Sequence, residues 1–307
     1  VIREFSKDED RKQEVEMGVY RPDLFKSIQE PIIVDEDNLK QLNIYRPGGP
    51  EGLPADTIQR KEELQLFKDL VWKLTEKEKS GTNALGVEVP LYDYVLDHLT
   101  MPFRYPGQKV RSAILMHSFK NQIGKSTVFE TVEEGLGEDN CIVITPENAC
   151  RREKAFLQNQ LVLIDELLID GDYKKKQSVL NTLKPLMASE KHDCRPLFKE
   201  SRQVYSTCNF MCFTNHVDAI AIEEHDARYT CIDVNKDREE MGGSKFFHKI
   251  WTPQGKIRGT IVNVVKHFLS HRDLSPGFDP AGISLNTNFI KTMSEHGGHP
   301  LFPVVKT

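Results

Sequence analysis

Runs of consecutive apolar residues mark the middle of the chain. They occur at residues 112–117 (SAILMH), 141–145 (CIVIT), 160–165 (QLVLID), 208–215 (CNFMCFTN) and 229–234 (YTCIDV). Because neighbouring positions in such a run are both apolar, the strand that it forms must be covered on both faces. Amphipathic and polar stretches separate the runs. The pattern predicts an α/β fold with a mostly parallel five-stranded sheet wrapped in helices.

Helical patterns flank this middle region. Apolar residues recur at helical spacing from Ile58 to Lys79, and residues 91–103 predict a second helix that ends before Pro106. After Lys236, the segments KFFHKIWT and GTIVNVVKHFLSHR predict two more helices, and a loop-rich tail follows from Asp273 to Thr307. We therefore expect three regions: an irregular and helical N-terminal region (1–103), a core (104–236), and a C-terminal helical and loop region (237–307).

Composition places the chain among ordinary globular proteins. Its 307 residues are 38% hydrophobic and 28% charged. No apolar run approaches the ~20 residues that span a bilayer, and no charged-then-apolar leader opens the chain, so we expect neither membrane insertion nor secretion. The first residue is Val1, from which we expect a piece of a longer polypeptide. A net charge of −5 argues against a uniformly basic nucleic-acid binder but allows a local basic element.

The six cysteines are not spaced like zinc ligands. No C-x-x-C occurs, and Cys208 and Cys212 would share one face of a predicted strand. We expect buried or free thiols in a reducing compartment rather than a zinc site.

Residues 117–127 (HSFKNQIGKST) end like a phosphate-binding loop, although Phe119 occupies the position of the first glycine in G-x-x-x-x-G-K-[ST]. A strand precedes the segment and a helix follows it, which is the context that such a loop requires. Gly124 would let phosphate approach the backbone, Lys125 would add positive charge, and the Ser126 hydroxyl could ligate Mg²⁺. The expected nucleotide-binding residues are Asn121, Gln122, Ile123, Gly124, Lys125, Ser126 and Thr127.

An acidic pair follows the third apolar run. Asp165 and Glu166 would lie at the carboxyl edge of the sheet, where open α/β sheets bind ligands. Asp165 would hold Mg²⁺ through water, and Glu166 would polarise the attacking water. The alternative is an exposed acidic pair without function. Asp165 follows Lys125 by forty positions, which leaves room for a helix, a strand and another helix, as in a Mg-nucleotide site.

Two further polar residues follow or begin strands. Asn215 could hydrogen-bond the γ-phosphate or the lytic water, or it could be a turn former at the end of a strand. Arg228 could reach the γ-phosphate of a neighbouring subunit, or it could be a surface arginine paired with Asp226 or Glu224.

Together these segments resemble the superfamily 3 helicases of viruses and phages, and more closely the helicase domain of poxvirus-type primase-helicases and phage primase-polymerase fusions. The segments that carry the resemblance are PGQKVRSAILMHSFKNQIGKST, FLQNQLVLIDE, LNTLKPLMASEKHDCRPLFKE, CNFMCFTN and HDARYTCIDV, within residues 104–234; LNIYRP near residue 42 and SKFFHKIW…HRDLSPGFDP add to it. The loop has fewer glycines than the family norm, and the family often has two arginines where this chain has Ala227-Arg228.

The resemblance implies an AAA+-like P-loop NTPase core that assembles into a ring, usually a hexamer, with ATP and Mg²⁺ between subunits. It implies Gly124, Lys125 and Ser126 as the phosphate loop, Asp165 and Ser126 as metal ligands, and catalytic roles for Glu166, Asn215 as sensor and Arg228 as arginine finger. It also implies a β-hairpin in the ring channel before the sensor strand, which CRPLFKESRQVYS fits, with Lys199 on the DNA phosphates.

Local charge agrees with DNA contact near that hairpin. Between Gly171 and Gln203 there are eight Lys or Arg against four Asp or Glu. We expect Lys199, Arg202 and Lys191 to contact DNA phosphates, whereas a solvated helix face explains the KKK of residues 174–176 as readily.

The resulting hypothesis is an ATP-dependent DNA helicase or translocase module of a viral or phage replication protein in the host cell cytoplasm. Its partners would be DNA, single-stranded in a central channel, further copies of the chain, and a primase or polymerase domain on the same chain. The alternatives are a P-loop ATPase without strand separation (a DNA loader, packaging motor or initiator) and an assembly module that binds nucleotide without hydrolysing it. A metabolite kinase is more distant, because no acceptor pocket or lid is indicated.

Overall fold

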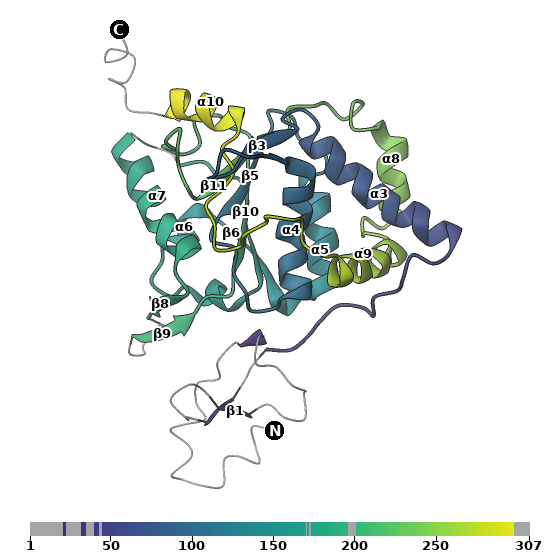
Figure 1. Cartoon of the computed structure of the whole chain (residues 1–307), viewed down its shortest axis with the longest axis horizontal. Coiled ribbons are helices and arrows are strands. Elements are labelled where there is room, and N and C mark those ends of the chain that lie inside the picture. The colour runs from purple at the N-terminus through teal and green to yellow at the C-terminus, as the bar shows by residue number, and fades with distance from the viewer. Residues whose placement is uncertain are drawn as a thin grey trace.

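The computed structural model describes residues 21–22, 32–34, 40–42, 45–169, 171, 173–195 and 201–297. At its centre is a five-stranded parallel sheet with the order β11-β5-β10-β7-β6 (Figure 1). The strands are β5 (Ala113–His117), β6 (Cys141–Ile144), β7 (Leu161–Ile164), β10 (Asn209–Thr214) and β11 (Tyr229–Asp233). The predicted α/β fold with a five-stranded parallel sheet is therefore confirmed, and all five apolar runs form its strands.

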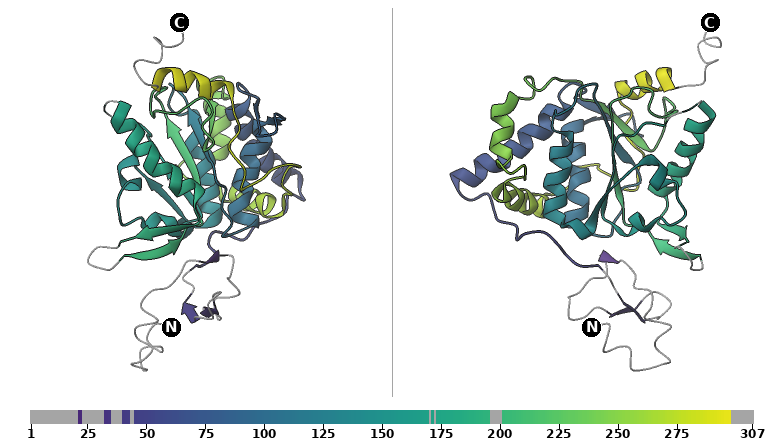
Figure 2. Two further views of the ribbon diagram at one scale, coloured as in Figure 1. Left: turned by 60° about the vertical axis from the view of Figure 1, so that its left-hand side comes forward. Right: turned by 180° about the vertical axis from the view of Figure 1, so that it is seen from behind.

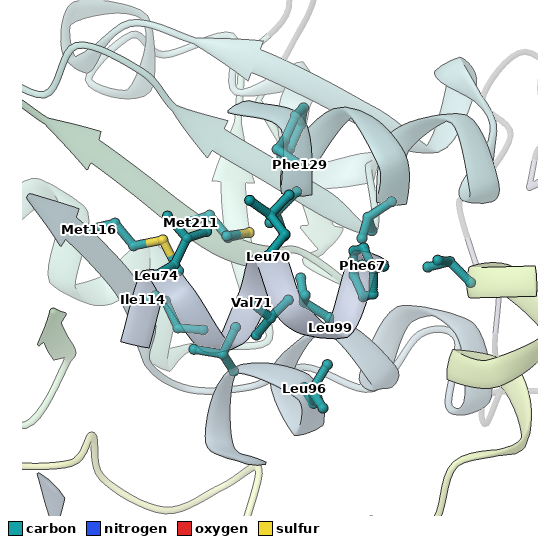
Figure 3. Packing of buried hydrophobic residues seen from close by; sticks show 14 of the residues in the cluster. Phe67, Leu70, Val71, Leu74, Leu96, Leu99, Ile114, Met116, Phe129 and Met211 are labelled. Atoms are coloured by element: carbon teal, nitrogen blue, oxygen red, sulfur yellow. The ribbon is translucent and has the colours of Figure 1, made fainter. Parts of the chain in front are cut away.

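Alternate residues of these strands point to opposite faces of the sheet, which explains the consecutive apolar positions. Ile114 and Met116 of β5 join one buried cluster, and Ala113 and Leu115 join another. In the second cluster Cys208 and Cys212 lie together, as expected for one face of a strand. The cluster on the first face also contains side chains from the helices packed on it (Figure 3).

Helices cover both faces of the sheet (Figure 2). One layer contains α3 (Ile58–Thr75), α4 (Leu91–Arg104), α5 (Lys125–Leu136), α8 (Gly243–Ile250) and α9 (Gly259–His271). The other contains α6 (Pro146–Ala149), the 3-10 helix η4 (Ala155–Gln158), α7 (Tyr173–Ala188) and α10 (Asn288–Gly297). A second short 3-10 helix, η3 (Glu138–Asn140), leads into β6.

Among the described residues, three antiparallel strand pairs lie outside the central sheet. They are β1 (Ile32–Val34) with β2 (Lys40–Leu42), β3 (Ser80–Thr82) with β4 (Glu88–Pro90), and β8 (Lys191–Cys194) with β9 (Arg202–Tyr205). The β8–β9 hairpin leads directly into β10, so it lies at the amino-terminal edge of the sheet. In Figure 1 it projects below the sheet, while α10 lies across the top.

Two sequence expectations were wrong in detail. The helix expected to reach Lys79 ends at Thr75, because the chain turns there into the β3–β4 hairpin, whose Thr82 bonds Asn286. The tail expected to be loop-rich contains α10, where Phe289, Ile290 and Met293 are buried in the second core cluster. Contacts distant in sequence stabilise both features, so local periodicity did not reveal them.

Candidate nucleotide-binding site

The loop between β5 and α5 has the backbone of an anion-binding turn. Gln122 and Gly124 adopt left-handed conformations, with φ of 59° and 99°. Gly124 caps α5 without a side-chain hydrogen bond to the first helical turn, whose N–H groups are unpaired within a helix. The loop is also held at its start, since the Ser118 amide donates to the Thr214 carbonyl at 3.1 Å and the Ser118 hydroxyl bonds the backbone of Lys120.

Phe119 does not obstruct this loop. Its side chain is 60% exposed, its ring packs edge-on against His117 at 4.6 Å between centroids, and it does not line the cavity described below. The left-handed turn that a first glycine would supply is made later, at Gln122 and Gly124. The missing glycine therefore leaves the phosphate-facing backbone open.

Lys125 is held beneath the loop. Only 9% of the residue is exposed, and its ammonium group donates to the Thr214 carbonyl and to Asn215 Oδ1, each at 3.1 Å. Burial lowers the pKa of Lys125 to about 8, and the nearby charge of Asp165 acts in the opposite direction. A cation in this position has few competing partners and is suited to an incoming polyanion.

The acidic pair follows β7 in a constrained turn. The Asp165 amide donates to the Ile144 carbonyl at 3.2 Å, and the Glu166 amide donates to the Asp165 carboxylate at 2.9 Å. Glu166 has φ of 49°, a left-handed conformation that costs a non-glycine residue about 1–3 kcal/mol and is concentrated at functional sites. The Glu166 side chain is exposed. The turn thus holds Asp165 partly buried and presents Glu166 outward.

Asn215 connects the loop with the neighbouring strand. It follows β10, which lies between β5 and β7 in the sheet. Its Nδ2 donates to Asn121 Oδ1 at 2.9 Å, while its Oδ1 accepts from Lys125. Because β10 is central, Asn215 stands between the loop and the acidic pair.

These groups meet around one cavity of about 490 Å³ at the carboxyl edge of the sheet. It is lined by Asn121, Gln122, Ile123, Gly124, Lys125, Ser126, Thr127, Asp165, Glu166, Phe213, Thr214, Asn215, Arg238, Phe247 and Trp251. A neighbouring cavity of about 270 Å³ at the end of β6 also touches Asp165 and Glu166. All seven predicted loop residues, both acidic residues and Asn215 are thus brought together.

Sequence reasoning missed the cavity wall formed by Arg238, Phe247 and Trp251. Arg238 Nη1 donates to Gln122 Oε1 at 2.7 Å, and its guanidinium lies 5.2 Å from the centre of the Phe247 ring. These residues follow β11 and are more than 100 positions from the loop. The only sequence signal was the helical pattern of KFFHKIWT, which does not indicate what the helix contacts.

Arg228 does not belong to this cavity. It directly precedes β11, and its carbonyl accepts from the Ala113 amide at the start of β5, so it lies at the opposite edge of the sheet from the loop. Within the described part of the chain, the Arg228 guanidinium forms no ion pair with Asp226 or Glu224. The Asp226 carboxylate pairs with Lys184 at 2.8 Å and accepts from the backbone amide of Arg228. Arg228 cannot reach the cavity of its own subunit.

The expected hairpin is present as β8 and β9, and it begins at Lys191, ahead of the segment that sequence reasoning assigned to it. Lys191 is exposed, with its ammonium group 4.9 Å from the centre of the Tyr205 ring. Arg202 pairs with Cys194 in the hairpin register, and Lys199 lies outside the described residues. Of the three residues predicted to bind DNA, Lys191 is the one whose side chain the structure describes, and it is exposed.

Comparison with known proteins gives a partial match in sequence and an extensive one in fold. Residues 116–228 match a family of unknown function (DUF5906), and this range contains every site residue predicted from the sequence. No curated protein matches the chain. The fold is similar to the apo structure of the NrS-1 C terminal region (305-718), with a TM-score of 0.68, 17% identity and coverage of 94% of this chain.

A second structure, the A form apo structure of the same NrS-1 region, is similar with a TM-score of 0.63 and 16% identity. In both comparisons the chain spans 62% of the NrS-1 region. At these identities the similarity concerns the fold. Among the described residues, no helix is both long and apolar enough to cross a bilayer.

Proposed function

We propose that the chain is a nucleoside triphosphate hydrolase that drives DNA movement: an ATP-dependent helicase or translocase module of a viral or phage replication protein. The observation that carries the proposal is the shared cavity of Lys125, the acidic pair and Asn215, which come from three adjacent strands. Phosphate recognition and water activation need these groups within one site.

The phosphate half of the site rests on backbone and charge. The free N–H groups at the start of α5 and the ammonium group of Lys125 bind the phosphate oxygens. Lys125 leaves its bonds to Thr214 and Asn215 in exchange for a stronger, charge-assisted bond to phosphate. Gly124 is required at this turn, because its φ is 99° and a Cβ there would lie 2.6 Å from the Leu70 side chain.

The donor set also fits Mg²⁺. The Ser126 hydroxyl and the Asp165 carboxylate line the same cavity, and hard oxygen donors of this kind suit the ion. When bound, Mg²⁺ neutralises charge on the phosphate oxygens. The described residues contain no cluster of three or more His, Cys, Asp or Glu side chains that could hold a metal by themselves, so the phosphates and water would supply the remaining ligands.

Hydrolysis requires a water positioned against the terminal phosphate. Glu166, exposed at the end of β7, accepts the proton of this water, and Asn215 donates a hydrogen bond that orients the water or the phosphate. Arg228 lies too far from the cavity of its own subunit to act there. We propose that it acts in the site of an adjacent copy. The proposed assembly is therefore a ring, usually a hexamer, with a site between each pair of neighbours.

Strand β10 supplies a direct route from the nucleotide to DNA. Asn215 follows its carboxyl end in the cavity, and the β8–β9 hairpin precedes its amino end. The hairpin base is fixed to the sheet by Lys109, whose ammonium group donates to the Ser206 hydroxyl at 2.7 Å. A change at Asn215 upon hydrolysis would thus reach the hairpin, whose lysines contact the DNA phosphates in the ring channel.

The deciding experiment measures ATP hydrolysis by the purified chain with and without single-stranded DNA, and its mass with and without nucleotide. The proposal predicts DNA-stimulated hydrolysis and a nucleotide-dependent oligomer. An unwinding assay on forked DNA separates the alternatives: hydrolysis without unwinding favours a loader, packaging motor or initiator. A ring that binds ATP and never releases phosphate favours an assembly module.

A further inference from the structure

We propose that Trp251 is the nucleobase platform of this cavity, with the base of the bound triphosphate stacked on its indole ring. The inference rests on the proposed function and assigns the half of the cavity that phosphate chemistry does not use. The relevant wall consists of Arg238, Phe247 and Trp251, which lie in or beside α8.

The order of the strands fixes the direction in which a nucleotide lies. Across the carboxyl edge, the acidic pair follows β7, Asn215 follows β10 and the loop follows β5. Adjacent strands are about 4.8 Å apart, so the acidic pair is roughly 10 Å to one side of the loop. The terminal phosphate belongs on that side, and the sugar and base must extend the other way. The strand on that other side is β11, and the chain that leaves it forms α8.

Trp251 is fixed in place yet open to the cavity. Its amide donates to the Phe247 carbonyl at 2.8 Å at the end of α8, and it forms a strand-like bridge with Ile257. The side chain packs on the first core cluster but is only half-buried, and it lines the cavity. An indole side chain that is anchored on the core and still borders the cavity is suited to stacking.

The position of α8 relative to the phosphate loop is also fixed. Phe247 is buried so close to Gly124 that a Cβ added there would lie 3.2 Å from the ring. The position of Trp251 relative to the loop is therefore fixed by packing, as a base-binding residue requires.

The Arg238 guanidinium is only partly engaged on this side, since its buried Nε has no hydrogen-bond partner among the described residues. Arg238 donates to Gln122, and its guanidinium lies against the Phe247 ring. The Trp251 indole offers stacking, which accepts any nucleobase ring. The ligand class is a nucleoside triphosphate whose base is recognised by its flat surface.

Fluorescence provides a direct readout, because the chain has two tryptophans. Trp72 is 52% exposed on α3, packs edge-on against Tyr92 and does not line the cavity. In the Trp72→Phe variant, Trp251 is the single indole. Mg-ATP should quench its emission, whereas inorganic tripolyphosphate, which has the phosphates without a base, should not. Equal responses to the two ligands, or none to ATP while ATP is bound, would overturn the inference.

Affinities complete the test. Trp251→Ala should weaken ATP binding roughly 5- to 150-fold, the range for loss of one base stack, and leave the affinity for tripolyphosphate unchanged. Trp251→Phe, which keeps an aromatic face, should retain most of the ATP affinity. An equal loss for both ligands would show that Trp251 supports the loop instead. If the wild-type chain binds tripolyphosphate as tightly as every nucleotide tested, Trp251 is not a base-binding residue, but the phosphate site is still supported.

Discussion

The ammonium group of Lys125 and the side-chain oxygen of Asn215 are joined by a hydrogen bond of 3.1 Å, which connects the phosphate loop to the central strand β10. The same asparagine returns to the loop through its Nδ2, which donates to Asn121. The Lys125 ammonium group has three donors and uses two of them in the described residues, so a bound phosphate would compete with this bond for the charge of Lys125. We therefore expect nucleotide binding to change the hydrogen bonds of Asn215 at the end of β10.

Replacing Glu166 by glutamine should separate binding from hydrolysis. The amide keeps the size of the side chain but cannot accept the proton of the attacking water, so turnover should fall by roughly 10²- to 10⁴-fold, the usual contribution of a general base. ATP affinity should remain near the wild-type value. Phosphate release and nucleotide titration measure the two quantities. Glu62→Gln, on an exposed position of α3, is the control; turnover of Glu166→Gln at the rate of this control would refute the assignment.

ATP affinity should depend on pH through Lys125. Burial lowers the pKa of the free site to about 8, and bound phosphate anions favour the charged form, so the pKa is higher in the complex. Below pH 8 both states keep the proton and affinity changes little. Above pH 8 binding must take up a proton, so affinity should fall by up to roughly tenfold per pH unit.

Calorimetric titration at several pH values measures this effect. The matched variant is Lys125→Arg, because a guanidinium does not lose its proton in this range. The ATP affinity of this variant should not change with pH above pH 8, where the affinity of the wild type falls. A wild-type profile as flat as that of the arginine variant would contradict the pKa assignment.

Arg228→Ala should abolish hydrolysis without affecting nucleotide binding in its own subunit. An arginine finger accelerates hydrolysis by about 10³- to 10⁵-fold, so loss of activity should be nearly complete. The decisive measurement mixes this variant with inactive Lys125→Ala subunits. Neighbours that combine an intact loop with an intact arginine should regain part of the ATPase activity.

Arg111→Ala serves as the control for the arginine finger. Arg111 precedes β5 at the same edge of the sheet and pairs with Glu190 at 3.0 Å. This variant should stay active alone. Mixed Arg228→Ala and Lys125→Ala subunits that remain as inactive as either one would show that Arg228 does not act in trans.

Lys191→Ala should weaken single-stranded DNA binding in a salt-dependent manner. If its exposed ammonium group contacts one phosphate, the slope of log affinity against log salt should become less steep by about 0.7. Lys61→Ala, on the exposed face of α3, should leave the slope unchanged. Fluorescence anisotropy over a salt series distinguishes them, and identical slopes for the two variants would exclude Lys191 from the DNA contact.

The predictable part of the site is the part that strand order determines. Lys125, Asp165 and Asn215 each follow a run of apolar residues, and the carboxyl ends of parallel strands share one edge, so their proximity follows from the pattern. The strands could be predicted from apolar runs because alternate residues of each strand are buried in two different clusters, one on each face of the sheet.

The unpredictable part depends on packing between distant segments. Arg238 and Trp251 reach the cavity only because α8 packs beside α3 and against Gly124, and no local spacing encodes those contacts. The loop tolerates Phe119 because Gln122 adopts the left-handed conformation that a first glycine would supply. Few non-glycine residues do so, and the sequence does not reveal it. Sequence patterns placed the candidate site residues after the ends of strands but did not reveal which residues enclose the cavity.

The most direct test of the account is calorimetric titration of Mg-ATP into the wild-type chain, Lys125→Ala and Lys120→Ala. Lys120 is the exposed lysine of the same loop and does not line the cavity, so its loss should be nearly neutral. Loss of the Lys125 bond to phosphate should weaken binding by roughly 10- to 150-fold. Equal affinities for the two variants, or no ATP binding by the wild-type chain, would contradict the claim that Lys125 holds the phosphates of a nucleotide in this cavity.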